Sequence, residues 1–157
     1  MATPSTVQVP PRAVDHLGVR HRTADRPRPR TEGPDVTNVD ATLKACLEID
    51  GATAAALVDY ESGMSLGQVG GGALDLDVAA AGNTDVVRAK LRTMQRLGLS
   101  EQIEDILITL GTQIHLIRLI QSQSGQGLFL YLVLKKDSSN LAMARRQLTI
   151  LERDLAI

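Results

Sequence analysis

The stretch Leu128-Phe-Leu-Tyr-Leu-Val-Leu134 is apolar at every position. A strand with one wet face alternates apolar and polar residues, whereas a strand that is apolar throughout is covered on both faces. We therefore expect residues 127–134 to form a central strand of a sheet, with further layers of structure above and below it.

Two more strands are predicted directly before this one. Ile103–Leu110 and Gln113–Ile120 are separated by the turn Gly111-Thr112, and a polar loop over residues 121–126 leads into the central strand. Connections this short join antiparallel neighbours. His115 falls on the second of these strands, where no acidic neighbour in the sequence offers it a catalytic or metal-binding role.

An earlier pair of strands is expected over Ala52–Tyr60 and Met64–Val69, joined by the turn Glu61-Ser62-Gly63. Gly67 and Gly72 have the spacing of the two glycines in a phosphate-binding P-loop. The lysine and hydroxyl residue that should follow them are replaced by Ala73-Leu74, so the sequence excludes a nucleotide site of that type.

Apolar residues at helical spacing predict three helices, at about 38–48, 75–97 and 139–155. Cys46 lies on the buried stripe of the first, as a small core residue. In the last, the apolar stripe is Leu141, Ala144, Leu148, Leu151 and Leu155. The side chains of Arg145, Arg146, Glu152 and Arg153 are expected outside.

The middle helix carries a broad apolar face that includes Asn83 and Lys90, flanked by a stripe of mostly small residues. Two interpretations of this side stay open: packing on the sheet, or contact with a helix of a second copy. The opposite side is expected to be solvated. The apolar face comprises Leu76, Ala79, Ala80, Val86, Val87, Leu91, Met94 and Leu97; the small stripe Val78, Gly82, Ala89 and Thr93; the solvated side Asp77, Thr84, Arg88, Arg92 and Gln95.

The composition changes near residue 36. All six prolines and a run of arginines, including Arg26-Pro-Arg-Pro-Arg30, come before it. This segment has no apolar periodicity and too few apolar residues to offset the entropy of ordering. We interpret residues 1–36 as a disordered Arg/Pro-rich tail and residues 37–157 as the folded domain. Whether the native chain begins at Met1 or nearer Val36 or Val39 is open.

Composition also excludes several classes of protein. The chain of 157 residues has 43% hydrophobic residues, enough for a packed core, but only 2% aromatic residues and no tryptophan. A base-stacking surface for nucleic acid is therefore poorly supplied. One cysteine rules out an internal disulfide or a cysteine zinc cluster. There is no run of about 18 apolar residues and no leader-like segment, which favours a cytoplasmic protein.

Together these elements predict an α/β (α+β) fold in the order helix, two strands, helix, three strands, helix. We expect one five-stranded antiparallel sheet between helical layers. The long helix should cover one face, and the two terminal helices the other.

At this level the chain resembles the roadblock/dynein light chain family, with a roadblock/profilin-like architecture. The resemblance covers about residues 38–155 and depends on the order of the elements. It also depends on these stretches: Leu47-Glu-Ile-Asp-Gly51, Ala54-Ala-Ala-Leu-Val-Asp59, Gly63, Glu104-Asp-Ile-Leu-Ile-Thr109 and Asn140-Leu141. The stretch from Gly82 to Arg92 looks like that of an actinobacterial subgroup.

The resemblance implies a non-enzymatic homodimer, in which two sheets join through the strand after the long helix. It also implies a Ras-like small GTPase as partner and a role as scaffold or regulator in signalling. We predict no catalytic, cofactor-binding or metal-binding residue. We also expect neither a cofactor nor a nucleic acid partner. The interface implied is Ile103, Asp105, Ile106, Leu107, Ile108 and Thr109, with Gly82, Asn83, Val86, Ala89 and Lys90.

Two alternatives remain at this stage. One is a small-molecule-sensing signalling module, since a sheet under a helical layer can enclose a pocket. The other is an enzyme, for which no nucleophile–base pair is evident. For a regulator of a GTPase, the sequence alone singles out no arginine that would approach a phosphate. The candidates are Arg88, Arg92, Arg96, Arg118, Arg145, Arg146 and Arg153.

Overall fold

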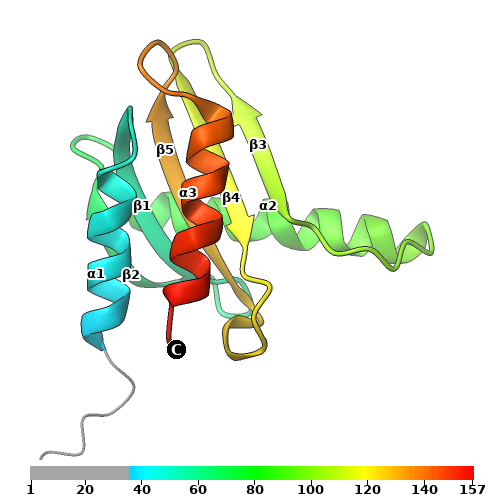
Figure 1. Ribbon diagram of the computed structural model, residues 1–157. Helices are drawn as coiled ribbons and strands as arrows, with labels where there is room; N and C mark the ends of the chain where they lie inside the picture. The colour runs from blue at the N-terminus through cyan, green and yellow to red at the C-terminus, as the bar shows by residue number, and fades with distance from the viewer. Residues whose placement is uncertain (1–35) are drawn as a thin grey trace, which may run out of the picture. The chain divides into compact units, whose positions relative to one another are not determined.

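The computed structural model describes residues 36–157, so the Arg/Pro-rich segment before them lies outside the described residues. Helix α1 begins at Val36, the last residue that the sequence assigned to the tail. The elements follow in the predicted order (Figure 1). They are α1 (Val36–Leu47), β1 (Ala52–Asp59), β2 (Met64–Gly70), α2 (Leu76–Arg96), β3 (Asp105–Thr109), β4 (Gln113–Leu119), the 3-10 helix η1 (Gln123–Gly125), β5 (Leu128–Lys135) and α3 (Leu141–Asp154).

The five strands form one antiparallel sheet in the order β2-β1-β5-β4-β3. The prediction that residues 128–134 lie at its centre is confirmed, because β5 pairs with β1 on one side and β4 on the other. Every residue of β5 from Leu128 to Leu134 is buried.

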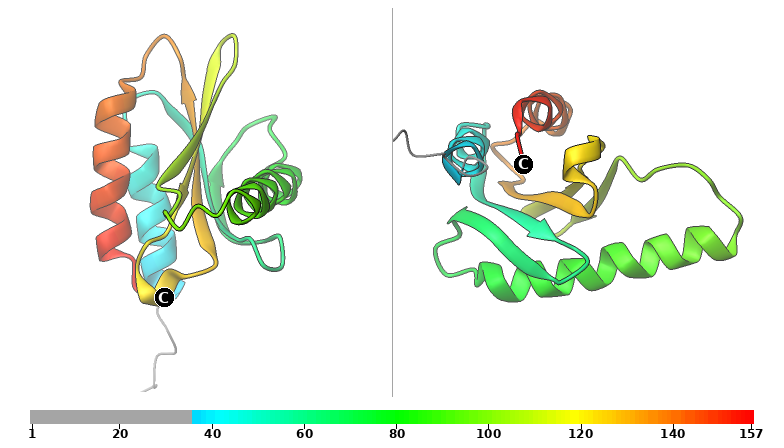
Figure 2. Two further views of the ribbon diagram at one scale, coloured as in Figure 1. Left: turned by 90° about the vertical axis from the view of Figure 1, so that its right-hand side faces the viewer. Right: turned by 90° about the horizontal axis from the view of Figure 1, so that it is seen from below.

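Helices cover both faces of this sheet, as predicted (Figure 2). Helices α1 and α3 lie on one face, where Leu130 and Leu132 of β5 join a core cluster with Leu43 and Leu148. On the other face Phe129 and Tyr131 belong to a second cluster, which includes Val87 of α2. The two clusters take alternate residues of β5, which explains why the strand is apolar throughout.

Short polar side chains cap the N-termini of α2 and α3. Asp75 accepts hydrogen bonds from the backbone amides of Asp77 and Val78 at the start of α2. Asn140 accepts one from the amide of Met143 at the start of α3. These caps satisfy backbone donors that have no partner within the helix, and they fix where each helix begins.

The prediction that Thr84 and Arg88 are solvated is wrong. Thr84 is only 1% exposed, and the Arg88 guanidinium donates hydrogen bonds to the carbonyl oxygens of Tyr60 and Glu61. The side of α2 that carries both residues lies against the β1–β2 turn. A helical wheel cannot show this, because the turn is supplied by a distant part of the chain.

We expect truncation of Leu148 to destabilise the fold strongly. Leu148 is fully buried between α3 and the sheet, and replacing a buried leucine by alanine costs about 2–5 kcal/mol. Ile150, two residues along the same helix, is 48% exposed and serves as the control. In urea unfolding, Ile150→Ala should lose far less stability than Leu148→Ala; equal losses would contradict this packing.

Candidate functional site

The sheet of residues 36–157 has two edge strands, β2 and β3, and they differ in regularity. Along β2 the pairing passes from Leu57↔Gly67 to Val58↔Ser65, which leaves Leu66 as an extra residue in a β-bulge. The pairing of β3 with β4 is unbroken from Asp105 to Thr109. Because bulges interrupt an edge and hinder further pairing, β3 is the edge better suited to accept another strand.

The backbone groups of β3 that face outward can be identified from its neighbours. The amide of Leu110 donates to the carbonyl of Gln113, and the carbonyl of Glu104 accepts from the amide of Leu119. Since direction alternates along a strand, Ile106 and Ile108 also turn their backbone groups toward β4. The backbone groups of Asp105, Leu107 and Thr109 therefore face the open edge.

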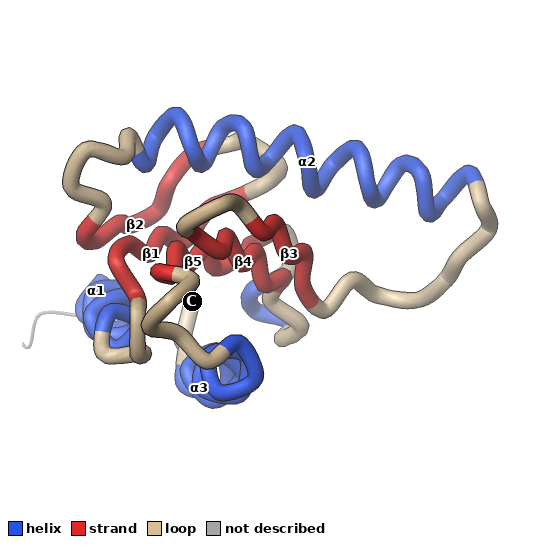
Figure 3. The backbone as a smooth tube through the Cα atoms, turned by 90° about the horizontal axis from the view of Figure 1, so that it is seen from above, coloured by secondary structure: helices blue, strands red, loops and turns tan. Residues whose placement is uncertain are grey.

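Helix α2 extends past this edge. Figure 3 shows its C-terminal part continuing beyond β3, with the connection to β3 returning from its tip. Two leucines at this tip are unusually exposed, Leu97 at 66% and Leu99 at 49%. Large apolar side chains on an overhanging helix end lack a covering surface within the described residues.

A groove lies beside α2 on the same face of the sheet. It has a volume of about 310 Å³ and runs between the N-terminal half of α2 and the residues His115 and Tyr131 of β4 and β5. The helix side of the groove includes Val78, Gly82 and Asn83. Ile106 and Ile108 of β3 lie on this face and are only partly buried.

The structure brings the two sets of predicted interface residues to the same side of the molecule. Residues 105–109 form the β3 edge, and Ile103 precedes it. Gly82 and Asn83 line the groove, and helical spacing continues their stripe through Val86, Ala89 and Lys90, all three exposed. Asn83 alone of the helix set is buried. Contact of these residues with a second copy stays a prediction.

His115 has partners that the sequence did not reveal. Its Nδ1 lies 3.0 Å from the Tyr131 hydroxyl, and its Nε2 lies 3.1 Å from Oε1 of Gln113. These distances fit a neutral imidazole that accepts from the tyrosine and donates to the glutamine. Burial lowers the pKa of His115, which favours the same neutral form. Burial also raises the pKa of Tyr131, an effect that the neighbouring Asn83 opposes.

A buried ion pair links α3 to β4, and it corrects the prediction that Glu152 lies outside. Nε of Arg118 donates to Oε2 of Glu152 at 2.8 Å, and both residues are more than nine-tenths buried. Oε1 of Glu152 accepts from the amide of Gln121. Arg145 forms a more exposed pair with Asp105 at 2.8 Å. Arg118 and Arg145 are thus engaged within the chain.

Two further kinds of chemical group in residues 36–157 are the cysteine and the potential metal ligands. Cys46 is buried, and burial raises the pKa of its thiol to about 12, so it is a poor nucleophile. Residues 36–157 contain no cluster of three potential metal ligands. Among their helices, none has the length and apolar character that a membrane span requires.

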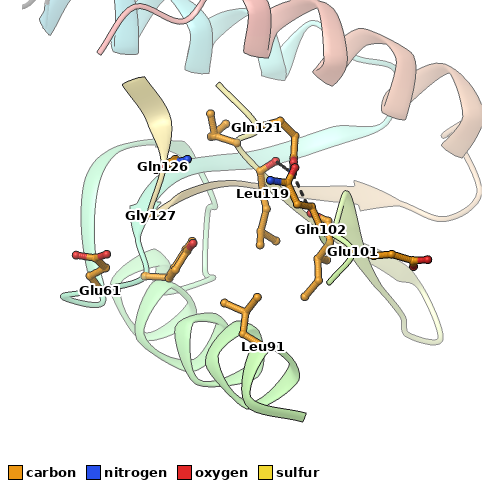
Figure 4. A pocket seen from close by; sticks show the side chains of 11 residues that line it. Glu61, Leu91, Glu101, Gln102, Leu119, Gln121, Gln126 and Gly127 are labelled. Atoms are coloured by element: carbon orange, nitrogen blue, oxygen red, sulfur yellow. Dashed lines mark hydrogen bonds between the residues drawn. The ribbon is translucent and has the colours of Figure 1, made fainter. Parts of the chain in front are cut away.

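A cavity of about 290 Å³ lies at the end of the sheet where β4 finishes (Figure 4). Leu91 of α2 and Leu119 of β4 point toward one another across it, while Glu61 and Glu101 lie at its two sides. The side-chain amide of Gln121 is used internally, because it donates to the carbonyls of Ile103 and Leu119.

Comparison with family profiles and with curated proteins gives no match. Solved structures do match. The Roadblock/LC7 domain from Streptomyces avermitilis aligns with a TM-score of 0.61 at 16% identity, over 73% of this chain and 91% of that one. MglB from Myxococcus xanthus aligns at 0.67 and 15% identity, covering 76% and 85%. The gliding protein MglB from Thermus thermophilus aligns at 0.62 and 17%, covering 76% and 86%. The chain therefore has the roadblock fold.

The lowered pKa of His115 leads to a prediction about stability. Burial lowers the pKa of His115 in the native state, whereas the unfolded chain has the ordinary histidine pKa of about 6.5. Below that pH the unfolded state binds the proton more readily, so stability should be complete above about pH 7 and fall as the pH decreases through the native pKa. Urea unfolding between pH 8 and pH 5 measures this dependence.

The control is His115→Gln, which has no titratable group at this position. As the solution is acidified, the wild type should lose more free energy of unfolding than the His115→Gln variant. A constant difference across the range would contradict the assignment.

Proposed function

We propose that this protein is a non-enzymatic homodimeric adaptor that binds a Ras-like small GTPase and scaffolds or modulates its nucleotide cycle. The observation that carries the proposal is the regular open edge of β3 lying beside the overhanging end of α2. An exposed strand edge next to exposed leucines is a surface that a soluble protein normally covers.

A two-fold axis through the centre of β3 would satisfy both features at once. Antiparallel pairing of two β3 strands would use the outward backbone groups of Asp105, Leu107 and Thr109 in each copy. The same rotation would carry the tip of each α2, which extends past β3, toward the sheet of the other copy. The small residues Gly82 and Ala89 would then allow the two long helices to approach closely.

The fold likeness to the gliding protein MglB supports a regulatory role, and a dimer of this kind leaves its outer helices free for a further protein. Helix α3 presents Met143 and Ile150, 50% and 48% exposed, on its outer side. Exposed apolar residues beside Arg146 suit a protein partner whose contact surface has an apolar centre and a polar rim. We assign no arginine finger; the Nε of Arg118 is paired with Glu152 inside the chain.

The cavity in Figure 4 favours a second candidate, a small-molecule-sensing signalling module. Its volume of about 290 Å³ is near the lower end for small-molecule sites, and it has both apolar and polar walls. A thermal-shift screen with nucleotides and metabolites tests this candidate. A large shift with one compound, lost on Leu91→Trp, would favour it over the adaptor.

Proline at position 107 should break the dimer and keep the monomer folded. The change removes an amide that faces the open edge, whereas proline at Ile106 or Ile108 removes one that bonds to β4 and should damage the fold as well. Thr109→Pro removes another outward amide at an exposed position. Light scattering should report about twice the chain mass for the wild type and a single chain mass for Leu107→Pro and Thr109→Pro.

The matched control is Gln68→Pro, at the edge formed by β2. Because the amide of Gly71 bonds to the carbonyl of Thr53, the alternation along β2 turns the backbone groups of Gln68 outward. This variant should remain a dimer. A monomeric wild type, or a dimer that survives both β3 changes, would overturn the proposed pairing.

Partner binding is tested with the small GTPase encoded nearest the gene of this protein. We expect co-purification and a change in the rate of GTP hydrolysis or nucleotide exchange when the adaptor is added. Leu107→Pro should weaken the effect if the GTPase contacts both copies. Absence of binding, with unchanged hydrolysis and exchange, would count against the adaptor.

A further inference from the structure

A second cavity, distinct from the β3 edge and from the cavity of Figure 4, lies between α3 and the end of β4. Its volume is about 360 Å³. Figure 2 shows that α3 and the loop of η1 lie on the same side of the sheet. The walls come from β4, from the two residues before η1 and from α3. The lining consists of Arg118, Gln121, Ser122, Thr149, Glu152 and Arg153.

Arg118 enters this cavity with most of its hydrogen-bonding capacity unused. The residue is 8% exposed, and its Nε donates to Glu152. Within residues 36–157 its two Nη atoms have no hydrogen-bond partner, yet the fully buried unpartnered side-chain atoms of this region are only Thr84 Oγ1 and Ser139 Oγ. Both Nη atoms therefore reach accessible space, and the cavity is the space that Arg118 lines.

Arg118 and Glu152 do not form the two-bond arrangement that gives the strongest arginine–carboxylate pair. An arginine and a carboxylate bind most strongly through two parallel N–H···O bonds. Here Oε1 of Glu152 is taken by the amide of Gln121, so the carboxylate meets Arg118 through Nε alone. The Nη side of the guanidinium is left as a planar set of donors, which matches a carboxylate or a phosphate group.

The charge balance at the cavity is positive. Glu152 neutralises one positive charge, that of Arg118, and Arg153 adds a second positive charge to the lining. The neighbouring acid Asp154 comes one residue after Arg153, about 100° further around the helix. Ser122 also lines the cavity, and its hydroxyl lies 3.5 Å from that of Ser124, where either oxygen can be the donor.

We propose that this cavity is an oxyanion-binding site, which takes a carboxylate or phosphate group between the Nη donors of Arg118 and the side chain of Arg153. Glu152 acts as the positioning residue that holds the guanidinium in place. The ligand group supplies the acceptors that a nine-tenths-buried arginine otherwise lacks within the chain. The proposal is independent of the β3 edge and of dimer formation.

The test is a titration of the full chain with sodium phosphate and, in a second arm, sodium acetate, at constant ionic strength and pH. Backbone amide resonances of Gln121 and Ser122 report on the site in two-dimensional NMR spectra. We expect saturable shifts at these amides. Saturation by phosphate alone indicates a phosphate-bearing ligand, and saturation by acetate as well indicates that the carboxylate of an acidic side chain is accepted.

Variants separate a built site from general attraction to basic residues. Arg153→Gln removes the exposed cation from the cavity and should weaken binding about three- to fivefold. Arg146→Gln removes an exposed arginine of the same helix that does not line the cavity, and it should leave binding unchanged. Arg118→Lys keeps the charge and loses the planar donor set, so binding should fall about tenfold or more while the circular dichroism spectrum stays that of the folded protein.

The proposal is overturned if neither anion gives saturable shifts at Gln121 and Ser122. It is also overturned if Arg153→Gln and Arg146→Gln weaken binding equally, because that result indicates nonspecific attraction. Should Arg118→Lys fail to fold, the comparison of the two glutamine variants decides the question by itself.

Discussion

Burial of β5 on both of its faces is the constraint on which the remaining structure depends. A strand without a polar side cannot lie under a single layer, so it requires structure both above and below it. In this sheet β5 also has a strand on each side, β1 and β4. Leu130 and Leu132 pack toward α1 and α3, while Phe129 and Tyr131 pack toward α2. This arrangement leaves β2 and β3 as the outer strands of the sheet.

The two outer strands differ in how regularly they pair with their neighbours. The extra residue Leu66 interrupts β2, whereas β3 keeps a regular ladder with β4. The length of α2 adds to the difference, because a helix of 21 residues reaches beyond the sheet on the β3 side. The surface that most needs covering and the strand that most readily accepts a neighbour thus lie together, which is the basis of the proposed adaptor.

Much of the fold could be predicted because its signals are local. The uniform apolar character of residues 128–134 and the helical spacing of Leu141, Ala144 and Leu148 are properties of short segments. The contacts of Arg118 with Glu152 and of Arg88 with the β1–β2 turn are not, since they join residues 34 and 28 positions apart. A charged residue looks solvated in a helical wheel until the tertiary structure supplies its partner. The hydrogen bond between His115 and Tyr131 joins two strands, so neither segment alone reveals it.

The bulge at Leu66 has a consequence for how far self-association can proceed. If both outer strands were regular, each added copy would expose a fresh strand, and growth into fibrils would have no natural end. Because β2 is distorted, pairing through β3 alone would stop at a dimer. An irregularity of one residue would therefore decide between a finite particle and a polymer, and repairing it by deletion would put the solubility of the concentrated protein at risk.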